Sequence, residues 1–169
     1  MNRIFDHKLK KERIIIDPGE YYVTSSDQII YTVLGSCVSV CLIDKKANLY
    51  GMNHFMLPNS AEKIFFKKGE FAKYGANAMD LLIRRMLNRG ADKYELTAKV
   101  FGGGHVLNFN GSGADVPINN IAFAIQYLEK AGINIESMDV GGTLPRRVFF
   151  YTETGEVHLS YIKERTILI

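Results

Sequence analysis

Short apolar runs separated by polar turns occupy the first third of the chain, and this pattern predicts β-strands. Residues 13–24 predict two strands on either side of a Pro-Gly turn. Residues 32–43 and 49–57 predict two further strands, joined by the polar turn DKKAN. Residues 1–13 are polar and charged instead, and we expect them to form a flexible N-terminal arm.

Two later segments have the 3.6-residue period of amphipathic helices. The first covers residues 74–89 and stops at Gly90, and its apolar face consists of Met79, Leu82, Ile83 and Met86. The second covers residues 119–131, with Asn119 or Asn120 as its N-cap and a glycine directly after it. Both segments are long enough to be the main helices of the fold.

Strand-like runs return between and after the helices, at residues 97–104, 133–142, 146–154 and 156–162, and a Thr154-Gly155 turn joins the last two. The order of strands, helix, strand, helix and strands is typical of an α/β fold with layered sheets. We therefore predict a single-domain sandwich of mixed or antiparallel sheet with two main helices. Residues 14–169 are expected to form this domain, after the arm.

The composition is that of a folded protein and narrows the choice of partners. Hydrophobic residues make up 47% of the 169 residues and charged residues 23%, unlike a disordered chain. The formal net charge of +3 is too small to indicate a nucleic-acid partner. No apolar stretch approaches the roughly 18 residues of a membrane span, and the start lacks a signal-peptide pattern. We expect a cytoplasmic protein without membrane insertion.

Cys37 and His54 are the candidate chemical pair. If DKKA forms a four-residue hairpin loop, these residues face each other on adjacent strands, with Cβ atoms about 4.5–5.5 Å apart. A histidine there can accept the thiol proton and so create a thiolate that attacks an amide or ester carbonyl. Gly35 lets the backbone bend and leaves amide groups free to face a developing oxyanion. A hydroxyl such as Thr32 or Ser36, or a backbone carbonyl, would orient the imidazole.

Plainer interpretations of these residues stay open. Cys37 also fits a small buried hydrophobic residue, and His54 a core histidine with satisfied hydrogen bonds. A redox switch between Cys37 and Cys41 is a further alternative, although neighbours on one strand hardly form a disulfide. The FGGGH stretch lacks the spacing and lysine of a P-loop and predicts a tight turn near the active site. The other histidines have no zinc spacing with the cysteines, so we expect no metal and no cofactor.

Five segments of the chain carry distinctive motifs, in this order: TVLGSCVSVCLID, GMNHFMLP, KYGANAMDLLIRRMLNRGA, LTAKVFGGGHVL and DVGGTLPRRVFFYTETGEVHL. Their order resembles the signature of the CheD family of chemoreceptor glutamine deamidases, over about residues 15–160. The resemblance implies an α/β sandwich related to bacterial deamidating toxins, with a Cys-His-Thr active site. Cys37 and His54 match the family's nucleophile and base. The family's threonine can stand six residues before the cysteine, where this chain has Tyr31, so Thr32 is the candidate third residue.

Two segments depart from the family's pattern. VPINN stands where IGxxN is usual and keeps Asn120 but not the glycine. Pro145 in GGTLPRR replaces another usual glycine. We expect both departures to affect surfaces for substrate or partner, because neither touches the cysteine or the histidine.

The resemblance implies an enzyme that converts glutamines on the cytoplasmic helices of chemoreceptors to glutamates through a cysteine thioester. Hydrolysis of methyl esters by the same route is a second expected activity. The alternative is a non-catalytic adaptor that binds and modulates a CheC-like chemotaxis phosphatase. The expected partners are therefore chemoreceptor cytoplasmic domains and a CheC-like phosphatase.

Overall fold

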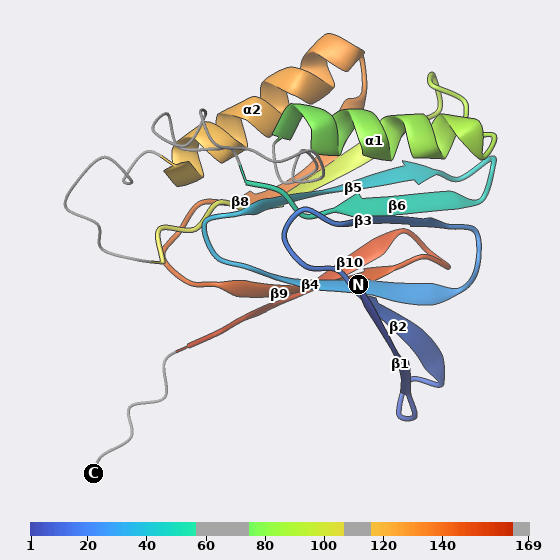
Figure 1. Cartoon of the computed structure of the whole chain (residues 1–169), viewed down its shortest axis with the longest axis horizontal. Coiled ribbons are helices and arrows are strands. Elements are labelled where there is room, and N and C mark those ends of the chain that lie inside the picture. Colours follow the sequence, from blue (N-terminus) through green and yellow to red (C-terminus); the bar gives the residue numbers. More distant parts are fainter. Residues whose placement is uncertain (57–74, 107–115, 164–169) are drawn as a thin grey trace.

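The chain folds into two stacked five-stranded sheets, and the computed structural model describes residues 1–56, 75–106 and 116–163 (Figure 1). The first sheet has the order β1 (Asn2–Asp6), β2 (Lys11–Ile15), β4 (Gln28–Leu34), β9 (Arg146–Tyr151) and β10 (Glu156–Tyr161). The second has the order β3 (Tyr21–Thr24), β6 (Leu49–Asn53), β5 (Val38–Asp44), β7 (Thr97–Gly102) and β8 (Asn134–Val140). The predicted α/β sandwich is confirmed.

Both helices, α1 (Gly75–Asn88) and α2 (Val116–Ala131), cover the outer face of the second sheet, and the first sheet covers its inner face (Figure 1). One apolar core lies between helices and sheet and includes Val38, Phe55, Leu82 and Leu128. The other lies between the two sheets and includes Ile30, Cys41, Met52 and Phe150. The second sheet is therefore buried on both faces. Neither described helix is long and apolar enough to cross a membrane.

The first helix ends as the sequence predicts, and the second begins earlier. Gly90 has a φ of 101° and donates its amide to the carbonyl of Leu87 at 2.9 Å, a typical helix end. The predicted start of α2 at Asn119 or Asn120 is wrong, because the helix already begins at Val116. Pro117 is well suited to a first turn, where its missing amide hydrogen is not needed.

The predicted strand over residues 32–43 is in fact two strands that belong to different sheets. The chain leaves the first sheet after Leu34 and enters the second at Val38. Residues 35–37, which we call the crossing loop, connect the two sheets. The continuous apolar run conceals this break because β5 is buried on both faces, and β4 carries apolar residues on both faces although its Val33 is exposed.

The expected flexible arm over residues 1–13 contains two strands instead. β1 pairs with β2, and β2 continues the first sheet as a parallel neighbour of β4, so the expected boundary at residue 13 falls inside a strand. Charged residues are paired here: Arg13 bonds to Asp6, and Lys11 bonds to Asp27 and Glu153 at 2.6 Å each. The polar sequence therefore reflects ion pairs on a sheet surface.

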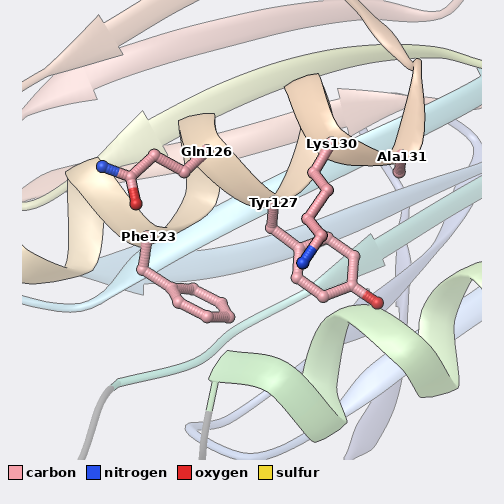
Figure 2. Close-up of a pocket in the computed structure, with 5 residues that line it drawn as sticks. All are labelled: Phe123, Gln126, Tyr127, Lys130 and Ala131. Atoms are coloured by element: carbon pink, nitrogen blue, oxygen red, sulfur yellow. The ribbon is translucent and has the colours of Figure 1, made fainter.

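A groove of about 500 Å³ runs along α2 beside α1 and is lined by Phe123, Gln126, Tyr127, Lys130 and Ala131 (Figure 2). The Tyr127 hydroxyl donates to Asp80 of α1 and so joins the helices. The ring of Phe123 packs edge-on against Phe55, with centroids 5.9 Å apart. Helix α2 is thereby fixed against the chain just after β6.

Truncation of α1 side chains tests this packing. Replacing Leu82, which is fully buried, by alanine is expected to lower the free energy of unfolding by about 2–5 kcal/mol. Replacing its neighbour Leu81, which is 37% exposed, should lower it by less than about 1 kcal/mol. Urea unfolding curves measure both changes, and equal losses would contradict the packing of α1 on the second sheet.

Candidate active site

His54 directly follows β6, and two hydrogen bonds fix its backbone to the turn before β3. Its amide donates to the carbonyl of Glu20 at 3.0 Å, and the amide of Gly19 donates to its carbonyl at 2.8 Å. The Pro-Gly turn predicted from the sequence makes the second bond possible. The side chain, only 3% exposed, is directed between the two sheets.

Thr32 of β4 contacts His54 across the gap between the sheets. Its Oγ1 lies 2.8 Å from Nδ1 of His54 and donates its single hydrogen to the carbonyl of Ile16 at 2.7 Å. Thr32 must therefore accept the bond to His54, so Nδ1 carries the imidazole proton. The other nitrogen, Nε2, is left with a free lone pair.

Burial keeps this imidazole neutral. It lowers the pKa of His54 from 6.5 to about 4, against the opposing effects of the Ile16 carbonyl and the carboxylates of Asp17 and Glu20. Nε2 is itself buried and has no hydrogen-bond partner among the described residues. A buried acceptor without a partner is costly in a folded protein, and such groups often mark functional sites.

The register that places Cys37 directly opposite His54 is wrong by two residues. Val38 pairs with Phe55 instead, through bonds of 3.0 and 2.9 Å, and Cys41 pairs with Met52. The four-residue turn covers Lys45–Asn48, because Asn48 adopts a φ of 50° that asparagine tolerates well. That asparagine was the signal in the sequence for the correct register.

The two-residue difference leaves Cys37 and His54 on the same face. Val38 and Phe55 face the helices, so the preceding residue of each points between the sheets. Cys37 packs against the core between the sheets, as expected. In a regular sheet, such diagonal neighbours lie about 7 Å apart, within reach of a thiol and an imidazole.

Cys37 is partly buried at the end of the crossing loop. Burial raises the pKa of its thiol, while a hydrogen bond from its own backbone amide acts in the opposite direction. The thiol is therefore protonated at neutral pH in the free protein and needs a base to become a nucleophile.

The FGGGH stretch lies against the crossing loop, but the predicted tight turn is wrong, because Phe101 and Gly102 still belong to β7 and the residues after them form no turn. The amide of Gly103 donates to the carbonyl of Cys37 at 2.7 Å, and that of Gly104 to the carbonyl of Gly35 at 2.8 Å. A side chain at Gly102 would place its Cβ 2.3 Å from the Cys37 carbonyl oxygen, so only glycine allows this approach. This stretch thus shapes the site through its backbone.

Cys41 lies in the core between the sheets and is fully buried. Burial raises the pKa of its thiol far above the ordinary value, which suppresses the reactive thiolate. This environment disfavours a redox switch. Among the described residues, no group of three His, Cys, Asp or Glu side chains could hold a metal ion.

Two contacts at the site were not predicted from the sequence, although Asn120 belongs to a segment that the family pattern marks. The carbonyl of Ile16 orients Thr32, and Nδ2 of Asn120 donates to the carbonyl of Ser36 at 2.9 Å. Backbone acceptors carry no residue-type pattern, and Asn120 lies on a helix 84 positions away from Ser36. Only the stacking of sheets and helices brings these groups together.

The depressed pKa of His54 predicts a loss of stability in acid. In the unfolded chain His54 binds a proton as the pH falls below about 6.5, whereas in the folded chain it does so only near pH 4. The free energy of unfolding therefore decreases as the pH falls through this window. The contribution of His54 is roughly 3 kcal/mol. Urea unfolding of wild type and His54→Gln at several pH values across the window measures it. The variant should lose less stability, and parallel curves would contradict the buried neutral imidazole.

Comparisons with known proteins agree on one family. The family model described as "CheD chemotactic sensory transduction" matches residues 56–161. The relatives named "Probable chemoreceptor glutamine deamidase CheD" from Laribacter hongkongensis and Methylobacillus flagellatus are each 42% identical to this chain. The first match covers 95% of this chain and 77% of the relative, and the second 96% and 80%.

A third relative, "Probable chemoreceptor glutamine deamidase CheD 1" from Shewanella oneidensis, is 41% identical over 96% of this chain and 78% of its own length. The family model begins after the candidate site residues, but the relatives align over nearly all of the chain. The resemblance in the sequence motifs is therefore confirmed over the chain as a whole, and this protein belongs to the CheD family.

Proposed function

We propose that this protein is a cytoplasmic deamidase that converts specific glutamines of chemoreceptor helices to glutamates. Curated relatives of about 40% identity bear names that state this activity. The observation that carries the proposal is the Thr32–His54 hydrogen bond, which leaves Nε2 of His54 as an unprotonated, unpartnered acceptor on the face that Cys37 shares. Thr32 would act by positioning the imidazole.

The reaction begins with two neutral groups. As the glutamine carboxamide enters, Nε2 of His54 accepts the thiol proton of Cys37 while the sulfur attacks the carbonyl carbon. The imidazolium then gives its proton to the departing nitrogen, ammonia leaves, and a thioester remains. Water deprotonated by His54 hydrolyses the thioester to glutamate and restores the thiol. A methyl ester would follow the same path, with methanol as the leaving group.

The surroundings of His54 stabilise the positive charge that the imidazole acquires during this reaction. The Ile16 carbonyl and the carboxylates of Asp17 and Glu20 all favour the protonated imidazole, although burial outweighs them in the free protein. A negative thiolate or oxyanion beside the ring adds the missing attraction. The imidazolium is therefore expected only during turnover.

Each turnover would replace a neutral side chain by a carboxylate on a receptor helix. Such a change alters pairing with neighbouring charges on the same and adjacent helices and so shifts the balance between signalling states. This gives the proposed activity a direct regulatory consequence. A CheC-like phosphatase is a proposed second partner, and its binding is compatible with catalysis.

Mass spectrometry of a receptor cytoplasmic fragment tests the proposed activity. Wild-type protein should raise the mass of specific glutamine-containing peptides by about 1 Da, and Cys37→Ala and His54→Ala should not. Cys41→Ala is the matched control, since Cys41 is buried away from the solvent, and it should retain activity. If wild type modifies no receptor fragment of its own organism while it binds a CheC-like phosphatase, the protein is an adaptor.

Variants of Thr32 test the orientation of the imidazole. Thr32→Val keeps the shape of the side chain but removes the hydroxyl that accepts from Nδ1, and kcat for deamidation should decrease about 10- to 100-fold. Thr32→Ser keeps the hydroxyl and should retain most of the rate. Steady-state kinetics on the receptor fragment decide the matter, and an equally active valine variant would remove Thr32 from the proposed site.

A further inference from the structure

All three carbonyl groups of the crossing loop accept hydrogen bonds. Amides of the FGGGH stretch donate to the first and third, at distances of 2.8 and 2.7 Å. The middle carbonyl, that of Ser36, accepts from the side chain of Asn120 at 2.9 Å. The donors in order along the loop are Gly104, Asn120 and Gly103. The loop is thus fixed through its backbone by two separate parts of the fold.

Asn120 differs from its neighbour Asn119 in the same turn of α2. Asn120 is fully buried and faces the crossing loop, whereas Asn119 is exposed. A buried carboxamide is favourable only where its hydrogen bonds are made. Its bond to Ser36 therefore has a specific geometric role, which an apolar side chain at this position of the helix could not supply.

The planarity of the peptide group transmits this bond to Cys37. The carbonyl of Ser36 and the amide hydrogen of Cys37 belong to one peptide plane and point in opposite directions. When Asn120 fixes the carbonyl, it also fixes the direction of the Cys37 N–H. The bond from Gly104 to Gly35 fixes the N–H of Ser36 in the same way.

The N–H of Cys37 belongs to the same residue as the reacting sulfur. This amide interacts with the sulfur of its own side chain and favours the thiolate form, which lowers the pKa against the larger effect of burial. A thiolate attack moves negative charge from this sulfur to the adjacent carbonyl oxygen. A donor beside the sulfur is well placed to follow that charge.

We propose that Asn120 is a positioning residue that orients the Ser36–Cys37 peptide so that the Cys37 N–H stabilises first the thiolate and then the oxyanion. In this step the sulfur–carbon bond forms, the π electrons of the carboxamide move to its oxygen, and the thiol proton goes to Nε2 of His54. The inference rests on the proposed deamidase function. In this proposal Asn120 acts through the Ser36–Cys37 peptide and not by contact with the substrate.

Asparagine variants on α2 provide the experiment. Asn120→Ala removes the donor to Ser36, and Asn119→Ala is the matched control on the exposed side of the same helical turn. The first readout is the pH dependence of Cys37 alkylation by iodoacetamide in a Cys41→Ala background. The second is kcat and KM for deamidation of the receptor fragment.

For Asn120→Ala, the alkylation midpoint should rise by about one pH unit. Its kcat should decrease at least about tenfold with a KM nearly unchanged, as for a lost oxyanion donor. Asn119→Ala should match wild type in both measurements. A folded Asn120→Ala variant with the wild-type alkylation profile and wild-type kcat would overturn the inference.

A wild-type measurement keeps the inference testable if Asn120 variants do not fold. A receptor peptide carrying an aldehyde in place of the target carboxamide forms a hemithioacetal with Cys37, in which the former carbonyl oxygen occupies the oxyanion position. The NMR signal of the Cys37 amide proton should move downfield in this adduct. An unchanged signal in the formed adduct would exclude this N–H as the donor.

The two readouts separate this inference from the proposed function. If wild type deamidates the receptor but Asn120→Ala leaves the alkylation profile and kcat unchanged, the inference fails and the function stands. If wild type modifies no receptor while the alkylation midpoint still shifts in Asn120→Ala, the function fails and the control of the thiolate by Asn120 stands.

Discussion

A single hydrogen bond between the two sheets, from Nδ1 of His54 to the hydroxyl of Thr32, organises the candidate site. It exists only because β4 and the end of β6 belong to sheets that stack face to face. The bond selects the imidazole tautomer, and the tautomer leaves Nε2 open to accept a proton. The proposed role of every other group at the site depends on its position relative to that open nitrogen.

Most of the fold was predictable, because the period of apolar residues reports burial directly. The strands before and after the helices, the helix end at Gly90 and the turn near Thr154 all follow from the sequence. The break at residues 35–37 does not, because both strands carry apolar residues on both faces, and so the apolar run shows no change of period where the chain passes into the other sheet. The paired charges of residues 1–13 likewise resemble a loose segment until their partners on other strands are known.

The sequence names the candidate residues of the site but does not give their geometry. A cysteine after Gly35 and a histidine on the adjacent strand indicate a reactive pair, and the family resemblance adds a threonine. Their placement depended on a register that Asn48 shifts by two residues, and only the even size of that shift kept the pair on one face. The contacts of Ile16 and Asn120 arise from packing between distant segments, which no local pattern records.

The crossing loop also links the chemistry to the mechanical integrity of the sandwich. Cys37 belongs to the short connection by which the chain passes from one sheet to the other, while the hydroxyl that orients His54 belongs to the sheet left behind. Sliding of one sheet over the other would therefore separate the hydroxyl of Thr32 from the imidazole and the thiol while each sheet kept its own hydrogen bonds. Under the proposed mechanism, catalytic competence is a property of the interface between the layers, and it reports their alignment more sensitively than secondary structure does.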